Sequence, residues 1–223
     1  MQRPTSRRQR ERATLALGAA AGAAATGFGV LARASARRET AEIDDAVLEH
    51  TAPEPGTTAR TAAQALAPVG KWYTYVPAAL AVASYLLAGS GSTRGRRRRP
   101  HQIPGAAAII VSSGVAFALS KAFDRWLPQP PAPPGHADRQ KPVFPSGHAF
   151  GPGSVALTAA YVLAREGQAR SAIAMPIAAA LPLLLAGGRM LDERHWASDV
   201  VGGYLGAIAV AGTCLAGYEL SRR

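Results

Sequence analysis

The sequence predicts an all-α fold, a polytopic membrane bundle of about six transmembrane helices in one domain. Its 223 residues contain six runs without Lys, Arg, Asp or Glu. Each run is roughly 18 to 23 residues long, the length that a helix needs to cross a hydrocarbon layer of about 30 Å. Charged residues crowd between the runs, so the mean hydropathy is only +0.03. The runs are residues 13–32, 72–93, 103–120, 142–164, 171–188 and 200–218.

The first run follows an arginine-rich start, a pattern that also fits a signal peptide. No small-x-small cleavage site stands out from its alanine background, so we interpret the run as a retained span. A polar outer loop follows it, and we expect part of this loop to be helical, with Ile43, Val47 and Leu48 as its apolar stripe. The predicted organisation is a basic cytoplasmic tail (1–12), the first span with the outer loop (13–70) and a core of about five spans (71–223).

The later runs are rich in alanine and glycine, and such small residues let membrane helices approach closely. Pro176 and Pro182 fall inside the fifth run. In a membrane such breaks are tolerated where neighbouring groups satisfy the freed backbone carbonyls. Cys214 is the one cysteine, so no internal disulfide can form.

The arginines predict the orientation of the chain, because positively charged loops stay in the cytoplasm. With six spans, the most basic segments fall on one side of the membrane, which puts both termini in the cytoplasm. The arginines responsible for the net charge of +11 lie at the ends of apolar segments, whereas a nucleic-acid-binding protein would carry them on one face of a soluble domain. We therefore expect membrane lipids as partners and no nucleic acid. The basic segments contain Arg3, Arg7, Arg8, Arg10, Arg12, Arg94, Arg96, Arg97, Arg98, Arg99, Arg165, Arg170, Arg222 and Arg223.

Two short strings near the C-terminus carry the residues of a phosphoryl-transfer site. One string is residues 145–148, Pro-Ser-Gly-His, and the other runs from Arg189 through His195 to Asp199. Under the six-span topology both strings and Lys121 lie at the outer membrane face. Motifs that match by chance have no reason to meet on one face, which favours a real site. Because that face is the outer one, we expect the site to be extracytoplasmic.

The two histidines suit the two halves of a displacement at phosphorus. His195 and Asp199 are four residues apart, a spacing that puts them on one face of a helix. A carboxylate on one ring nitrogen leaves the other nitrogen free to attack. His148, when charged, is a fitting acid for the leaving oxygen.

The remaining candidates bind the phosphate oxygens. Gly147 lets the backbone of a helix start come close to an anion, and Ser146 adds a hydroxyl donor. Arg189 offers a planar fork for two oxygens. We expect Asp192 and Glu193 to be solvated, because carboxylates repel phosphate. We expect Arg194 to flank the fifth span.

These motifs resemble those of the type 2 phosphatidic acid phosphatase superfamily, which includes lipid phosphate phosphatases and undecaprenyl-diphosphatase-like membrane enzymes. The second and third motifs match, except that Gly188 stands where the family usually has serine. The first motif matches in part: Lys121 is its lysine, but the arginine expected seven residues later is absent. Arg139, our first choice, or Arg125 is expected to replace it.

The resemblance implies a metal-independent hydrolase without a cofactor, which works through a phosphohistidine on His195. The substrate would be a lipid phosphate or diphosphate, such as phosphatidate, phosphatidylglycerophosphate or a polyprenyl diphosphate. Two alternatives stay open. One is a membrane relative with weak or lost turnover. The other is an enzyme like the vanadate-dependent haloperoxidases, but those enzymes are soluble and this sequence predicts six membrane spans.

Overall fold

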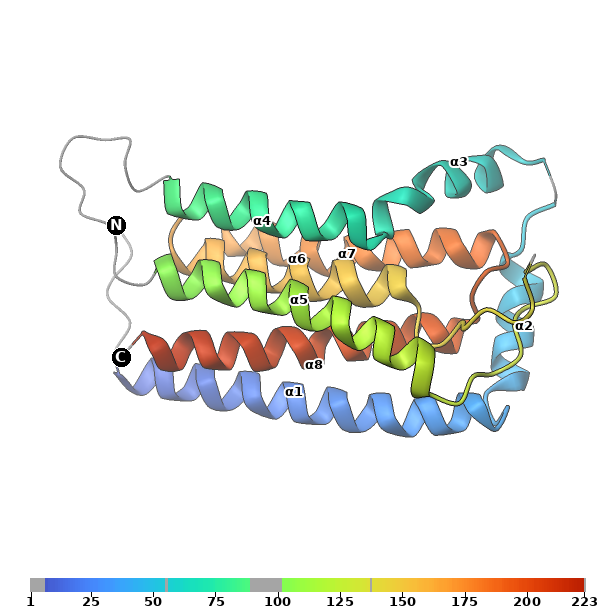
Figure 1. The fold of residues 1–223 in the computed structure, drawn as a ribbon, viewed down its shortest axis with the longest axis horizontal. Helices are drawn as coiled ribbons and strands as arrows, with labels where there is room; N and C mark the ends of the chain where they lie inside the picture. The colour runs from blue at the N-terminus through green and yellow to red at the C-terminus, as the bar shows by residue number, and fades with distance from the viewer. Residues whose placement is uncertain (1–6, 55, 89–101, 137, 223) are drawn as a thin grey trace.

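The computed structural model describes residues 7–54, 56–88, 102–136 and 138–222. In these residues the long helices run side by side along one axis, and the short helices α2 and α3 lie at one end (Figure 1). The elements are α1 (Arg7–Ala36), α2 (Ala41–Thr51), α3 (Thr58–Leu66), the 3-10 turn η1 (Ala67–Gly70), α4 (Trp72–Ala88), α5 (Gln102–Trp126), α6 (Gly147–Arg165), α7 (Ser171–Leu191) and α8 (Ala197–Ser221). The described residues contain no strand, and the all-α prediction is confirmed.

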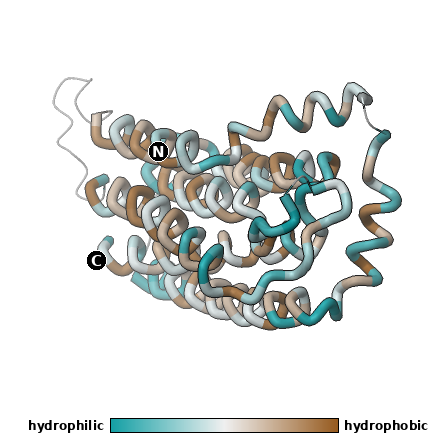
Figure 2. The backbone as a smooth tube through the Cα atoms, turned by 45° about the vertical axis from the view of Figure 1, so that its right-hand side comes forward, coloured by the Kyte–Doolittle hydropathy of each residue, from teal (hydrophilic) through white to brown (hydrophobic). Residues whose placement is uncertain are grey.

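Each predicted run corresponds to one long helix. In the part of the chain that is described, four helices are long and apolar enough to cross a membrane: α1, α5, α7 and α8. The 17-residue α4 is shorter but apolar, and α6 lies parallel to the others (Figure 1). Hydrophobic segments follow the helices, and hydrophilic ones gather in the connections (Figure 2). Large aliphatic side chains are exposed on outward faces, as lipid contact requires: Leu80, Ile110, Val111, Ile177, Leu184 and Val201.

Small residues set the spacing between α8 and its neighbours, as the composition predicted. A Cβ atom on Gly212 would lie 3.0 Å from Cβ of Ala21, so α1 and α8 approach closely. A Cβ atom on Gly153 would lie 2.8 Å from Cβ of Ala207, between α6 and α8. The first run is therefore packed into the bundle. Its helix already begins at Arg7, inside the predicted basic tail.

The outer loop is part-helical, and its predicted apolar stripe is correct only in part: Leu48 packs against the buried cluster of Ala132, Val143 and Trp196, and Val47 is half-buried. Ile43 is 67% exposed, and the buried side chain of α2 is Asp44. The Asp44 carboxylate accepts hydrogen bonds from the amide and the hydroxyl of Ser198, both at 2.8 Å. The first amides of a helix lack partners within it, so Asp44 stabilises the start of α8. A polar contact thus anchors α2.

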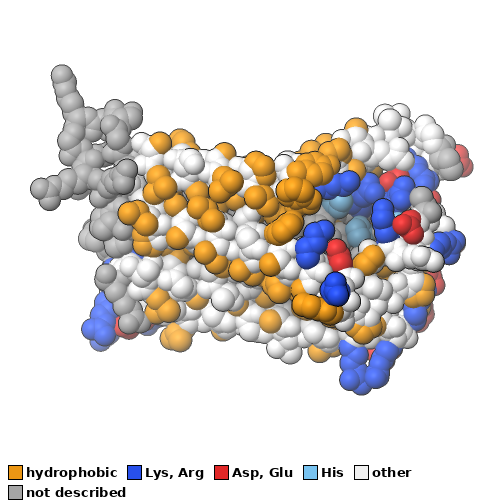
Figure 3. Space-filling view, viewed as in Figure 1, with side chains coloured by type: hydrophobic (Ala, Val, Ile, Leu, Met, Phe, Trp, Pro, Cys, Tyr) orange, Lys and Arg blue, Asp and Glu red, His pale blue; other side chains and the backbone are white. Residues whose placement is uncertain are grey.

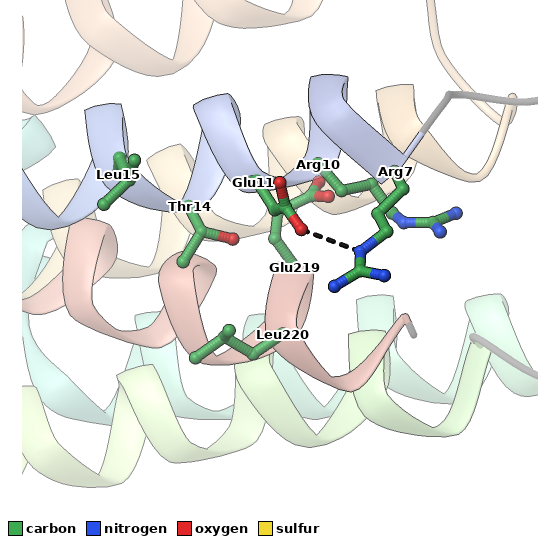
Figure 4. Close-up of a pocket in the computed structure, with 7 residues that line it drawn as sticks. All are labelled: Arg7, Arg10, Glu11, Thr14, Leu15, Glu219 and Leu220. Atoms are coloured by element: carbon green, nitrogen blue, oxygen red, sulfur yellow. Dashed lines mark hydrogen bonds and ion pairs between the residues drawn. The ribbon is translucent and has the colours of Figure 1, made fainter.

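An ion cluster lies at the opposite end of the bundle. Glu219 is buried and accepts hydrogen bonds from Arg165 at 2.6 and 2.8 Å and from the Tyr161 hydroxyl at 2.9 Å. A cavity of about 590 Å³ opens beside it, between α1 and α8, where Arg7 pairs with Glu11 at 2.9 Å (Figure 4). No predicted catalytic residue lines this cavity.

Candidate active site

The residues of the three motifs lie at the end of the bundle that carries α2 and α3. Lys121 is near the end of α5, and α6 starts with the second motif. The third motif joins the end of α7 to the start of α8. On the face in Figure 3, Lys and Arg side chains gather near this end around recessed His side chains. The fold therefore brings together helix ends that are far apart in the sequence.

A backbone hydrogen bond joins the second motif to the third. The Ser146 amide donates to the Asp199 carbonyl oxygen at 2.9 Å. This approach needs a glycine on α8, because a Cβ atom on Gly203 would lie 2.5 Å from the Ser146 carbonyl oxygen. Ser146 is the N-cap of α6, but its hydroxyl makes no capping bond and is buried without a hydrogen-bond partner. A donor is thus held ready at the helix start.

His195 does not lie on the helix, contrary to the prediction from its spacing with Asp199. The helix α8 begins at Ala197, with Trp196 as its N-cap. The Asp199 Oδ2 atom accepts the Trp196 amide at 2.8 Å and lies 3.5 Å from Nδ1 of His195. A capping turn, and not a shared helix face, therefore brings the pair together.

The His195–Asp199 contact is not yet a hydrogen bond. Nδ1 of His195 and Oδ1 of Asp199 are both buried and lack a hydrogen-bond partner. Leaving a buried polar group unsatisfied costs about 1–3 kcal/mol. Nδ1 lies 3.5 Å from Oδ2 of Asp199, so a small rotation of the imidazole would form the hydrogen bond and fix the tautomer that leaves Nε2 free.

His148 lies in the first turn of α6, and its ring centroid is 6.4 Å from that of His195. Its Nε2 atom is 2.9 Å from the carbonyl oxygen of Ala67, to which it donates. Gly70 lies against the ring: a Cβ atom there would be 2.1 Å from Cδ2 of His148. The turn η1 therefore covers His148 and holds the nitrogen that would serve as the acid.

Arg189 pairs with a carboxylate. Its Nη1 atom is 3.0 Å from Oδ2 of Asp192, which is buried. The same carboxylate accepts the Gln64 amide at 2.8 Å and lies 3.3 Å from Nε of Arg194. The expectation of a solvated Asp192 is wrong, because cationic and amide side chains surround it. Arg194, expected as a simple flank, belongs to this cluster.

Glu193 ties the third motif to α3. Its Oε1 atom is 3.0 Å from Nη1 of Arg60, and Nε of Arg60 is 3.8 Å from Asp192. Glu193 is therefore also not the solvated residue that we expected. Sequence reasoning missed Arg60 and Gln64, although their spacing of four residues puts them on one face of a helix.

A cavity of about 150 Å³ lies beside His148, between the start of α4 and the end of α5. Lys121, which we expect to bind phosphate, lines it, and Gly147 borders it with open space where a Cβ atom would be. Lys71, which sequence reasoning did not assign, lines it as well. The cavity is lined by Gly70, Lys71, Trp72, Tyr75, Phe117, Ser120, Lys121, Gly147 and His148.

The two proposed substitutes for the missing arginine do not line this cavity. Arg139 is exposed and donates to the Pro134 carbonyl oxygen at 3.0 Å, and Arg125 is exposed as well. Next to the position of the missing arginine, Gln129 has a structural role. Its amide accepts from the Phe144 amide and donates to the Phe144 carbonyl, both at 2.9 Å. Gln129 thereby fixes the loop that leads into the second motif.

The loop before the second motif also passes close to the third. Burial lowers the pKa of His136, and the positive charge of Arg194 lowers it further. Among the described residues, no group of three or more His, Cys, Asp or Glu side chains could hold a metal ion.

Comparisons with known proteins agree with this arrangement. The model of the PAP2 superfamily matches residues 72–223. A crystal structure described as the first transmembrane PAP2 type phosphatidylglycerolphosphate phosphatase from Bacillus subtilis is similar, with a TM-score of 0.70 at 17% sequence identity. The similarity covers 87% of this chain and 94% of that chain. No curated protein matches the sequence.

Proposed function

The chain belongs to the PAP2 superfamily of membrane phosphatases, and we propose that it hydrolyses lipid phosphates or diphosphates through a phosphohistidine, without a metal. One observation carries the proposal: the rings of His148 and His195 lie 6.4 Å apart, with Asp199 next to His195. Two imidazoles at this separation can flank one phosphorus atom. One can then attack while the other donates a proton.

In the first step, Nε2 of His195 forms a bond to phosphorus as the bond to the leaving oxygen breaks. His148 gives its proton to that oxygen, so the leaving group departs as an alcohol or as a phosphate. The phosphorylated imidazole carries positive charge, and the Asp199 carboxylate stabilises it. In the second step, His148 takes a proton from water, which attacks phosphorus. The P–N bond breaks and phosphate leaves.

The oxygens of the transferred group need fixed donors, because positioning and electrostatics provide most of the catalysis in phosphoryl transfer. Lys121, Arg189, the Ser146 hydroxyl and the Gly147 amide are the proposed donors. The free hydroxyl of Ser146 and the open space at Gly147 support this assignment. In the resting structure Arg189 pairs with Asp192, so phosphate would replace that carboxylate.

A lipid substrate is supported by the cavity beside His148, which combines a cationic side with aromatic walls. Lys71 and Lys121 suit a phosphate, and Trp72, Tyr75 and Phe117 suit the adjoining hydrocarbon. We propose a phosphomonoester lipid as the first substrate to test, since the similar Bacillus subtilis protein is described as a phosphatidylglycerolphosphate phosphatase. Phosphatidate and polyprenyl diphosphates, including undecaprenyl diphosphate, are the next substrates to test.

We propose a location in the cell membrane, with both termini in the cytoplasm and the site on the outer face. The end of the bundle with Arg165 and Arg222 would be cytoplasmic under the positive-inside rule. Arg3, Arg94, residues 96–99 and Arg223, which also support this orientation, lie outside the described residues.

Phosphate release from a panel of lipid phosphates tests the proposal. The purified protein in detergent should turn over at least one lipid in excess chelator, because both catalytic groups are side chains. Orthovanadate should inhibit, since its trigonal bipyramid fits a site built for in-line attack. An absence of release from every lipid would contradict the function. Activity that requires a divalent ion after chelation would contradict the metal-free mechanism.

A further inference from the structure

We propose that Lys71 binds the substrate phosphate in place of the missing first-motif arginine, an inference that rests on the proposed phosphatase function. The first motif supplies Lys121 but no arginine seven residues later, where Pro128 stands. The arginines that could compensate, Arg139 and Arg125, do not line the cavity beside His148. Lys71, between η1 and α4, does line it.

In the resting structure the backbone of Lys71 is held in place by its neighbours. The preceding residue, Gly70, packs against the His148 ring so closely that no Cβ atom would fit. The Lys71 amide donates to the Pro68 carbonyl at 3.2 Å, which closes the turn. In the resting structure Lys71 therefore lines the same cavity as His148, Lys121 and Gly147.

The charge of Lys71 is also available. Within the described residues, its amino group forms no ion pair with a carboxylate and lies 5.9 Å from the centroid of the Tyr73 ring. Arg189, in contrast, pairs with Asp192. A phosphate that enters the cavity would therefore meet the charges of Lys71 and Lys121 without displacing an acidic partner.

The test compares Lys71→Ala with Lys141→Ala, a control at an exposed lysine of the loop before the second motif. We expect Lys71→Ala to raise KM and the vanadate inhibition constant about ten- to hundredfold, the value of one charged hydrogen bond. Lys71→Arg should restore most of the loss, and Lys141→Ala, Arg139→Ala and Arg125→Ala should change little. Equal, small effects at Lys71 and Lys141 would overturn the assignment.

A binding measurement separates this inference from the proposed function. Vanadate should raise the melting temperature of the wild-type protein in detergent and raise that of Lys71→Ala much less. If the wild type turns over no lipid but shows this difference, the lysine assignment stands and the proposed function fails. Equal stabilisation of both proteins by vanadate would overturn the assignment, whatever the activity.

A second inference comes from residues 58–70, which form α3 and η1. We call this segment the strap. We propose that the strap closes the resting site and must move before phosphoryl transfer. The carbonyl of Ala67 holds the proton-donating nitrogen of His148. Gln64 and Arg60 bind the carboxylate of Asp192, which also holds Arg189. The strap thus binds Nε2 of His148 directly and holds Arg189 through Asp192, and the proposed reaction needs both groups free.

The strap lies outside the span that matches the family, and its contact with α7 offers a direct test. A Cβ atom on Gly188 would be 3.6 Å from Cβ of Ala63, within the range of about 3.5–4.5 Å for a disulfide. The double variant Ala63→Cys, Gly188→Cys is made in a background with Cys214→Ala, which removes the natural cysteine. Oxidation should then lock the strap on α7.

We expect oxidation to reduce turnover at least about tenfold, and reductant to restore it. The two single-cysteine variants should not respond to oxidation. A fully cross-linked protein that works as fast as its reduced form would overturn the inference, and so would failure of the pair to cross-link. The reduced form tests the proposed function separately. If it is inactive, vanadate should still speed hydrogen exchange of residues 58–70, and unchanged exchange would overturn the inference.

Discussion

The Ser146 amide and the Asp199 carbonyl oxygen share a 2.9 Å hydrogen bond, and both residues are fully buried. Through this bond the turn proposed to bind phosphate and the residue that supports His195 form one unit. The start of α6 and the start of α8 cannot shift independently without breaking it. The geometry of the attack that we propose for His195 therefore depends on how closely the two helices approach.

Gly203→Ala should disrupt this approach. The added methyl group would lie 2.5 Å from the Ser146 carbonyl oxygen and 2.9 Å from Cβ of Ala149. Overpacking of this kind costs about 1–3 kcal/mol, so we expect a lower melting temperature and a lower kcat. Gly217→Ala on the same helix is the control, because nothing lies within 4 Å of its added Cβ. Equal melting temperatures for both variants would refute the prediction.

His195→Ala should abolish turnover, and His148→Ala should lower kcat by about 10²–10⁴, the usual contribution of a general acid. Both variants should insert into the membrane and elute as the wild type does, since each histidine is partly buried at the polar end of the bundle. Mass spectrometry after a rapid alkaline quench should find the phosphoryl group on His195. A phosphorylated His148, or wild-type rates in either variant, would reverse or remove the assigned roles.

Asp192→Asn should act in two directions. Loss of the charge weakens the bonds from Arg189, Arg194 and Arg60, so we expect a stability loss of about 1–3 kcal/mol in a denaturant or thermal assay. It also releases Arg189, so vanadate should inhibit at a severalfold lower concentration. Glu193→Gln, which loses a contact with Arg60 alone, is the control. Weaker inhibition of Asp192→Asn would mean that Asp192 orients Arg189 for phosphate and does not compete with it.

Cysteine labelling tests the orientation. In a Cys214→Ala background, Gln140→Cys lies in an exposed loop at the end with the site, and Gln168→Cys lies in an exposed loop at the other end. An impermeant thiol reagent should label Gln140→Cys in intact cells and Gln168→Cys only after lysis. The opposite pattern would put the site in the cytoplasm and move the substrate to the inner leaflet.

The sequence predicted the helices well because their signals are local. Long charge-free runs and small residues are properties of contiguous segments, and each run became one helix. The cluster of Lys121, His148 and His195 at one end also followed from counting spans. The start of one helix was predicted less accurately: the fourth run begins at Pro142, but α6 starts only at Gly147.

The errors concern contacts between distant segments. Asp192 looked solvated because its partners, Arg60 and Gln64, lie far earlier in the chain. The contact between Asp44 and Ser198 also joins distant segments, so the sequence did not predict it. We predicted Ile43 as a buried residue of this helix instead, but it is exposed. The spacing of His195 and Asp199 gave the right neighbours for the wrong reason, because a capping turn brings together the same residues as a helix face.

The bond between Asp44 and Ser198 has a consequence for how relatives of this protein can diverge. The family match starts at residue 72, yet Asp44, Arg60 and Ala67 contact its motifs from outside that span. Transplanting residues 72–223 onto another N-terminal helix would keep every motif residue and lose these contacts. Two enzymes with the same motifs can therefore differ in rate and in access to the site through segments that a motif comparison never inspects.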